Sequence, residues 1–364
     1  MPKILINNTN LFFDVYGSSL SVNKDAVTQK PTLLVLHGAH GVVDHTLYVK
    51  FWSQFSDVAQ VVFLDQRGCG RSDKTSSAEW CLKSWGRDIV DFCEALSITK
   101  PIVAGVSMGG HVMCEYISQF PEHPSGLIFC NTEAKFDVEV MVDKMSELGG
   151  AEIGEICRKN FTKPTPEIVQ QYKKHCIPFY AKNAYTAEQI NRCIQRPEIF
   201  EHYCKYGMKT FNYLDQLCKV SCPTLLMVGA ESPLHPPSSA KAMAERIQPD
   251  LLTYHEFKGA GAPVYNDAPE EAKQVVLGFL SHLKQKNCFS YLIHWIFHLA
   301  LLLMKIILFF TLIKTLLSEN QDLLSIKPYC MSFYIGIFLN LYRTSRVGFV
   351  IIGTPLPHVS AHIG

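Results

Sequence analysis

Residues 102–110, IVAGVSMGG, decide the fold. They begin with a short, continuous apolar run, which is typical of a strand buried on both faces of a parallel sheet. The run leads into a G-x-S-x-G motif at residues 105–109, and residues 108–120 continue with helical spacing. A serine on such a tight strand-to-helix turn presents its hydroxyl above the sheet, beside a helix N-terminus that favours developing negative charge. The pattern predicts Ser107 as a nucleophile rather than as part of a chance Gly/Ser turn.

Similar apolar runs recur on both sides of this motif, separated by helical stretches. Five of them are TLLVLHG at 32–38, VVFLD at 61–65, GLIFCN at 126–131, PTLLMVG at 223–229 and LLTYHEF at 251–257. Near the N-terminus, KILI at 3–6 and LFFDVYG at 11–17 are typical of a hairpin around a polar turn. The alternation of strands and helices predicts an α/β fold with a mostly parallel, doubly wound sheet.

The sequence changes character along its length, which predicts four segments. Residues 1–132 form the first part of the α/β core, and residues 219–286 form the second part. Between them, residues 133–218 consist of polar helical stretches broken by Pro and Gly, which predicts a helical cap on the sheet. Residues 287–364 are a hydrophobic C-terminal tail.

Within the tail, residues 289–317 contain an apolar run long enough to span a bilayer of about 30 Å. Lys305 lies near its middle, which costs about 3 kcal/mol on insertion scales. The tail is therefore either a C-terminal membrane anchor or a non-native, poorly ordered extension of a finished domain. Because MPKILINNTN at the N-terminus lacks the apolar core of a signal peptide, we expect a cytoplasmic protein, membrane-associated if the tail is an anchor.

Composition argues against several other classes of protein. The net charge is +1, so no overall field favours nucleic acid as a partner. The 13 cysteines are scattered, with no C-x-x-C pair and no Cys/His zinc spacing. The sequence therefore predicts free thiols in a reducing compartment, no metal and no cofactor, and it leaves the oligomeric state open.

Four motifs together give the sequence a family resemblance. They are LHG at 36–38, LDQRGCGRSD at 64–73, EWCLKSWGRDI at 79–89 and GVSMGG at 105–110. With the helical insertion, residues 3–285 resemble the α/β-hydrolase fold, and more narrowly the branch that contains the proline iminopeptidases. Residues 37–41 depart from that branch, because they read HGAHG where it usually has His-Gly-Gly-Pro-Gly. We expect the charged side chains of the 64–73 loop to hold that loop rather than to contact substrate.

The resemblance implies an oxyanion hole made by the backbone N–H groups of Ala39 and Met108. It also implies the chain order nucleophile, acid, histidine, with the acid after the next-to-last strand and the histidine after the last strand. In this sequence the acid position is Ser232 and the histidine position is Ala262. Neither residue has a group that could activate Ser107, and a serine hydroxyl is a weak nucleophile without a neighbouring base.

Other residues offer a carboxylate or an imidazole. Glu133 follows the strand at 126–131, a site from which some hydrolases supply an alternative acid, whereas strand geometry directs Glu231 away from the acid position. His235 lies in the loop after the acid strand, within reach of the pocket rim. Three further histidines, His37, His40 and His255, also carry an imidazole. We expect none of them to act as the base, because each is more often a rim or packing residue.

Two functions remain open. The first is a degenerate hydrolase, impaired or inactive, that binds a small acyl or peptide-like ligand. The second is an active serine hydrolase of a small ester or amide, or a proline iminopeptidase-like enzyme, with a non-standard base. Acidic cap residues that could hold a substrate amine in the second case are Glu198, Glu201 and Asp215. The double loss at Ser232 and Ala262 favours the first function.

Overall fold

The computed structural model describes residues 2–23, 26–284, 301, 304 and 305. Met1–Val22 and Val27–Lys284 form one unit by their contacts. No helix in the described part of the chain is both long and apolar enough to span a membrane. The apolar run at 289–317 and the rest of the 287–364 tail lie outside the described residues, apart from 301, 304 and 305.

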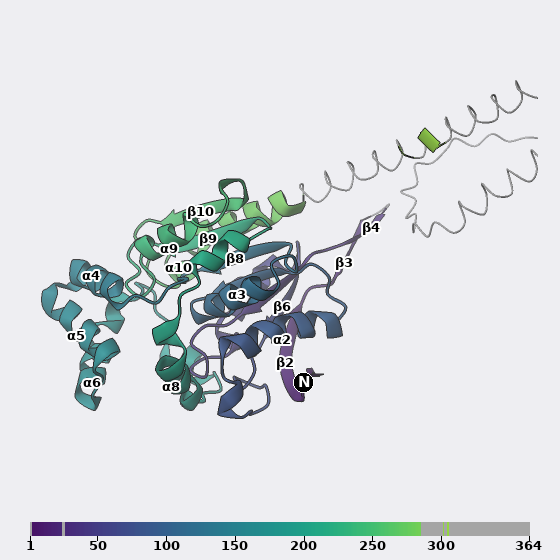
Figure 1. Ribbon diagram of the computed structural model, residues 1–364. Coiled ribbons are helices and arrows are strands. Elements are labelled where there is room, and N and C mark those ends of the chain that lie inside the picture. The colour runs from purple at the N-terminus through teal and green to yellow at the C-terminus, as the bar shows by residue number, and fades with distance from the viewer. Residues whose placement is uncertain (1, 24–25, 285–300, 302–303, 306–364) are drawn as a thin grey trace, which may run out of the picture. The chain divides into compact units, whose positions relative to one another are not determined.

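The central sheet has eight strands in the order β1-β2-β6-β5-β7-β8-β9-β10 (Figure 1). The strands are β1 (Lys3–Ile6), β2 (Thr9–Tyr16), β5 (Thr32–Leu36), β6 (Gln60–Leu64), β7 (Ile102–Val106), β8 (Gly126–Cys130), β9 (Thr224–Gly229) and β10 (Leu252–Phe257). β1 and β2 form the predicted antiparallel hairpin, and β2 is also antiparallel to β6. The remaining pairs, from β6 to β10, are parallel. The predicted α/β fold class is confirmed.

Helices connect the strands and cover both faces of the sheet. They are α1 (Val49–Trp52), α2 (Leu82–Ala95), α3 (Met108–Gln119), α4 (Val138–Gly149), α5 (Ala151–Thr162), α6 (Pro166–His175), α7 (Ala187–Asn191), α8 (Pro197–Tyr206), α9 (Pro237–Ala244) and α10 (Val264–Asp267). Residues 269–284 form a further helix. Two short strands, β3 (Leu20–Asn23) and β4 (Ala26–Gln29), make a separate two-stranded sheet that the sequence pattern does not predict.

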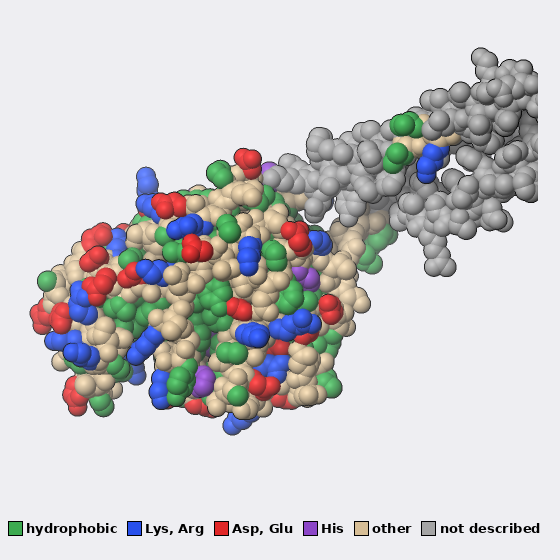
Figure 2. All heavy atoms as spheres, viewed as in Figure 1, with side chains coloured by type: hydrophobic (Ala, Val, Ile, Leu, Met, Phe, Trp, Pro, Cys, Tyr) green, Lys and Arg blue, Asp and Glu red, His purple; other side chains and the backbone are tan. Residues whose placement is uncertain are grey.

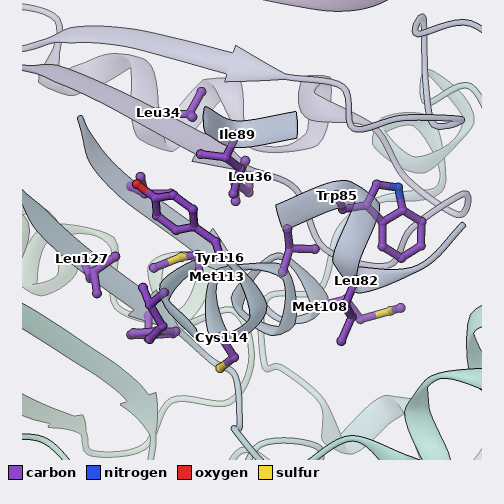
Figure 3. Packing of buried hydrophobic residues seen from close by; sticks show 14 of the residues in the cluster. Leu34, Leu36, Leu82, Trp85, Ile89, Met108, Met113, Cys114, Tyr116 and Leu127 are labelled. Carbon is purple, nitrogen blue, oxygen red and sulfur yellow. The ribbon is translucent and has the colours of Figure 1, made fainter. Parts of the chain in front are cut away.

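β5 illustrates how the strands receive helices on both faces. Leu34 and Leu36 belong to the cluster that contains side chains of α2 and α3, as Figure 3 shows. Leu33 and Val35 belong to the opposite cluster, with side chains of α1 and of the 269–284 helix. Because successive strand residues point to opposite faces and both faces are buried, the strand is a continuous apolar run rather than an alternating one.

Helices fill the segment between β8 and β9, which contains one isolated bridge and no longer strand. α4, α5 and α6 form a separate group in Figure 1 around their own small core, which includes Met145, Cys157 and Tyr172. α8 packs differently, because its Ile199 and Tyr203 are buried in the main core. The helical character predicted for residues 133–218 agrees with this arrangement, whereas the cap boundaries stay a prediction.

The described surface carries both signs of charge. Figure 2 shows Lys and Arg side chains interspersed with Asp and Glu side chains on the visible face. Many are paired across short distances, as in the ion pair of Lys144 Nζ with Glu147 at 2.7 Å. Together with a net charge of +1, this pattern gives no long-range field toward a polyanion.

Candidate active site

Ser107 lies on a strained turn between β7 and α3. Its φ of 52° and ψ of −122° place it in a region that residues other than glycine rarely occupy. The turn is closely packed: a Cβ on Gly105 would lie 2.7 Å from the Gly109 backbone, and a Cβ on Gly109 would lie 2.5 Å from the Leu36 carbonyl oxygen. A side chain at either glycine of the motif would therefore clash with neighbouring backbone atoms. The strained turn holds Ser107 at the carboxyl end of β7.

His235 supplies an imidazole beside this serine. It lies in the loop between β9 and α9, it is 6% exposed, and its Nε2 is 3.1 Å from Ser107 Oγ. The His235 backbone N–H donates to Ser232 Oγ at 3.3 Å, so the residue at the usual acid position helps to hold the turn that carries this histidine. From the sequence we expected no histidine to replace the one missing at Ala262. The structure nevertheless places His235, which the sequence puts within reach of the pocket rim, at hydrogen-bond distance from Ser107.

Glu133 binds the other side of the same imidazole. It follows β8, it is 5% exposed, and its Oε2 is hydrogen-bonded to His235 Nδ1. The neighbouring Thr132 donates its hydroxyl to the Ser107 carbonyl oxygen at 2.8 Å, which fixes this segment against the serine turn. With Nδ1 donating to the carboxylate, the His235 Nε2 lone pair faces the Ser107 hydroxyl. The three residues have the hydrogen-bond order of a Ser-His-acid triad.

The charge state of Glu133 suits this arrangement. Burial alone would raise the pKa of its carboxyl group, but the neighbouring His235 and His111 outweigh burial and lower that pKa to about 2. The carboxylate is therefore ionised at neutral pH, where it can only accept hydrogen bonds. An ionised acceptor at this position stabilises the imidazolium that forms when His235 takes a proton.

The three residues come from neighbouring strands. β7, β8 and β9 are adjacent and parallel, so their carboxyl ends meet at one edge of the sheet. Ser107 follows β7, Glu133 follows β8 and His235 precedes α9 in the loop after β9. Glu133 and His235 each lie one strand earlier than the acid and histidine positions implied by the family resemblance, and the three residues still follow in the order serine, carboxylate, histidine along the chain.

The loop after β5 lies against the serine turn. A Cβ on Gly38 would lie 3.0 Å from Ser107 Cβ, so only glycine allows this approach. Ala39 has a φ of 40°, and neither its N–H nor that of Met108 donates a hydrogen bond to another group in residues 2–23 and 26–284. Both N–H groups thus remain candidates for the oxyanion hole.

Ala262 lies in a loop that is occupied by backbone contacts. Its N–H donates to the Tyr180 carbonyl oxygen at 2.6 Å, and a Cβ on Gly261 would lie 2.0 Å from the same oxygen. The Gly261 N–H donates to Asp267 Oδ2 at 2.8 Å. The loop that the resemblance assigns to the histidine is therefore packed against the segment that follows α6, without a titratable side chain at residue 262.

The other candidates from the sequence are engaged elsewhere. His37 Nε2 accepts the Gln66 N–H at 3.2 Å, and burial lowers the pKa of His37. His40 is hydrogen-bonded to the Gln66 side chain at 2.9 Å, and burial lowers its pKa to about 3. His255 pairs with Glu271 at 2.8 Å, and Glu231 pairs with Lys182 at 3.5 Å, in both cases with partly exposed side chains.

One cluster has the composition of a metal site. Asp44, His45 and Asp65 are buried, and each places a ligand atom within 4.8 Å of the others. These groups are already paired, because Asp44 accepts from Arg71 at 2.9 Å and Asp65 accepts from the His45 ring at 2.8 Å.

Arg67 similarly binds Asp88 through two nitrogens. The charged residues of the 64–73 loop therefore hold that loop, as expected from the sequence.

Sequence comparison identifies related hydrolases. The family model described as alpha/beta hydrolase fold matches residues 31–269. Proline iminopeptidase PfmaB of Pestalotiopsis fici is 22% identical over 253 residues, which cover 65% of this chain and 88% of that protein. The putative carbamate hydrolase RutD of a Caulobacter species is 25% identical over 225 residues, which cover 61% of this chain and 81% of that protein.

Solved structures share the same architecture. The proline iminopeptidase of Mycobacterium smegmatis aligns with a TM-score of 0.62 at 19% identity, and the alignment covers 79% of this chain and 99% of that one. The enol-lactonase of Burkholderia xenovorans aligns with a TM-score of 0.58 at 17% identity, over 77% of this chain and all of that one. At such identities the likeness establishes a shared fold and leaves the substrate open.

Proposed function

The chain belongs to the alpha/beta hydrolase fold family, and we propose that it is an active serine hydrolase of a small ester. Ser107 is the nucleophile, His235 is the general base and Glu133 is the acid of this proposed triad. The observation that carries the proposal is the continuous chain of hydrogen bonds from Ser107 Oγ through His235 to Glu133. A site that had lost its catalytic function would have no need to keep these three side chains in that order.

The first half of the proposed reaction forms an acyl-enzyme. His235 Nε2 takes the hydroxyl proton of Ser107 while Oγ bonds to the ester carbonyl carbon. The negative charge that develops on the carbonyl oxygen is placed near the N–H groups of Ala39 and Met108. As the tetrahedral intermediate collapses, the bond to the alcohol breaks and the His235 imidazolium gives its proton to the leaving oxygen.

The second half regenerates the enzyme. His235 Nε2 takes a proton from water, and the water oxygen bonds to the acyl carbon. The bond between that carbon and Ser107 Oγ then breaks, and the imidazolium returns a proton to Oγ. In both halves Glu133 stays ionised, keeps the His235 ring in its orientation and stabilises the imidazolium.

An ester is proposed over an N-terminal aminoacyl substrate. An iminopeptidase has to hold a substrate amine, and the carboxylates suggested from the sequence for this role are all exposed: Glu198, Glu201 and Asp215. Asp215 pairs with Arg246 at 3.1 Å. Glu133 is buried but already binds two histidines. The related proteins include an iminopeptidase and an enol-lactonase by name, so the two substrate classes need a direct comparison.

Parallel assays with p-nitrophenyl acetate and proline p-nitroanilide test this proposal. We expect the wild-type chain to hydrolyse the acetate and to favour it over the anilide. Ser107→Ala should lower acetate turnover by about 10⁶-fold, because the nucleophile is lost. The matched control Ser238→Ala, at an exposed serine, should behave as wild type. A faster anilide reaction would overturn the ester assignment, and no turnover of either compound would overturn the enzyme assignment.

A further inference from the structure

Glu133 has a second histidine partner in addition to His235. Its Oε1 is 2.9 Å from His111 Nε2, while its Oε2 is hydrogen-bonded to His235 Nδ1. Each carboxylate oxygen therefore has its own imidazole. Because the two oxygens of a carboxylate are rigidly linked, a hydrogen bond at Oε1 also fixes the direction of Oε2 toward His235.

His111 is placed by the same turn that carries Ser107. It lies in the first turn of α3, four residues after Ser107, and it is 1% exposed. Its ring stacks on Phe211 with a centroid separation of 4.1 Å and an interplanar angle of 24°. Helix geometry and stacking thus restrict the orientation of the ring.

Tyr203 binds the remaining nitrogen of His111. Its hydroxyl is 3.0 Å from His111 Nδ1, and the side chain, which comes from α8, is 1% exposed. The ring also packs edge-to-face on Trp85 with a centroid separation of 5.9 Å. The Tyr203 side chain is therefore held in the main core, although its backbone belongs to the helical segment between β8 and β9.

The ionised Glu133 carboxylate determines where the hydrogens lie in the hydrogen-bond network that it forms with His111 and Tyr203. Glu133 only accepts, so His111 Nε2 carries a hydrogen and donates it to Oε1. In the neutral ring, Nδ1 is then an acceptor and the Tyr203 hydroxyl donates to it. Removal of that hydroxyl leaves Nδ1 a buried, unpaired acceptor and takes away one of the two hydrogen bonds that hold the ring, while the ionised carboxylate still requires the hydrogen on Nε2.

We propose that His111 and Tyr203 are a positioning pair, which holds the Glu133 carboxylate toward His235 and ties its orientation to helix α8. Neither residue is assigned a contact with substrate. This inference rests on the proposed hydrolase function, since it assigns Glu133 as the acid. It predicts that removing the Tyr203 hydroxyl from α8 lowers turnover because the Glu133 carboxylate is held less firmly toward His235.

The test compares Tyr203→Phe with Tyr206→Phe. Both remove one hydroxyl from α8, and both side chains line the same surface pocket of about 250 Å³, but Tyr206 is 60% exposed. Tyr203→Phe should lower kcat for p-nitrophenyl acetate by about tenfold with KM unchanged, as expected for one lost hydrogen bond in a charged network. Tyr206→Phe should leave both constants unchanged. Equal behaviour of the two variants would overturn the inference.

A double variant distinguishes positioning from packing. His111→Leu should lower kcat by about 10-fold to 100-fold, because Glu133 loses a donor. If Tyr203 acts only through His111, adding Tyr203→Phe to His111→Leu should cost nothing further. Additive losses would mean that the tyrosine acts by packing, and would contradict the inference.

Ring ¹⁵N spectra of histidine-labelled protein decide the point without any turnover. The His111 signals, assigned by their loss in His111→Leu, should show hydrogen on Nε2 in both wild type and Tyr203→Phe, and the Nδ1 signal in Tyr203→Phe should move toward that of a nitrogen without a hydrogen-bond donor. An unchanged Nδ1 signal in Tyr203→Phe would overturn the inference even if the enzyme is active. Conversely, a chain without esterase activity that shows the expected Nδ1 change would overturn the proposed function and leave the hydrogen bond between Tyr203 and His111 standing.

Discussion

His235→Ala is expected to lower kcat for p-nitrophenyl acetate by about 10⁶-fold, the effect of removing the histidine of a Ser-His-acid triad. The physical reason is the 3.1 Å contact between His235 Nε2 and Ser107 Oγ, which gives the serine proton its acceptor. Without it, catalysis falls to what transition-state binding supplies, about 10³-fold to 10⁴-fold over water. Steady-state kinetics, with circular dichroism to verify folding, measures the loss.

Two controls sharpen this experiment. His255→Ala removes an imidazole from a partly exposed residue paired with Glu271, and it should leave kcat unchanged. Free imidazole added to His235→Ala should restore part of the activity, since a small base can enter the space left by the ring, whereas it should do nothing for His255→Ala. Retention of most of the wild-type kcat in His235→Ala would mean that another group takes the proton.

Glu133→Gln is expected to lower kcat by about 10⁴-fold, the cost of a wrong histidine tautomer in a triad. A glutamine amide has one oxygen and one NH₂ group, whereas Glu133 accepts from His235 and His111 with two oxygens. One ring must therefore reverse its tautomer. If His235 does so, Nε2 carries the hydrogen and cannot accept the Ser107 proton. Kinetics measured on Glu133→Gln and wild type would show the loss in kcat rather than in KM.

Glu231→Gln is the matched control for the acid. Glu231 is adjacent to the usual acid position, its side chain is 42% exposed, and it pairs with Lys182. The same isosteric change there should leave kcat as in wild type. A loss at Glu231 together with normal activity of Glu133→Gln would place the acid after β9, against the proposed triad.

The lowered pKa of Glu133 adds a stability consequence to the same variant. The carboxyl group ionises near 4.5 in the unfolded chain and near 2 in the folded one, so the folded state is favoured when the group is ionised. This contribution is fully present above pH 4.5 and disappears as the pH falls toward 2. Urea unfolding should show a larger free energy of unfolding for the wild type than for Glu133→Gln at neutral pH. The difference between the two proteins should shrink as the pH falls from 4.5 toward 2.

Much of the fold follows from local sequence. Strands that are buried on both faces, such as β5 and β7, must be apolar throughout, and the G-x-S-x-G turn marks where one of them meets a helix. The strands β3 and β4 lack such a signal, because they form a small separate sheet outside the eight-stranded one. Burial on both faces thus makes the central strands the easiest ones to predict from the sequence.

The candidate site was only partly predictable. Ser107, Ala39 and Met108 follow from motifs, and Glu133 and His235 could be singled out as substitutes. Whether Glu133 and His235 come together beside Ser107 depends on which loops meet above the sheet. The spacing of residues along one strand does not show this. The structure supplies the missing information: β7, β8 and β9 are adjacent, and residues that follow neighbouring parallel strands meet at one edge of the sheet.

His111 and Tyr203 were missed altogether. The spacing of four residues between Ser107 and His111 places both on one side of α3 and could have drawn attention to the histidine. Nothing in the sequence shows that Tyr203, almost a hundred residues later, lies against that ring, because this contact depends on how α8 packs on the core.

Labelling of Ser107 by an alkyl fluorophosphonate tests the central claim, that His235 activates this serine, without any assumption about substrate. The rate of labelling is measured in wild type, His235→Ala and His255→Ala, and peptide mass spectrometry locates the adduct. We predict rapid modification of Ser107 in wild type and His255→Ala, and a rate lower by at least about 10³-fold in His235→Ala. Equal rates in all three proteins, or an adduct on a different residue, would contradict the account.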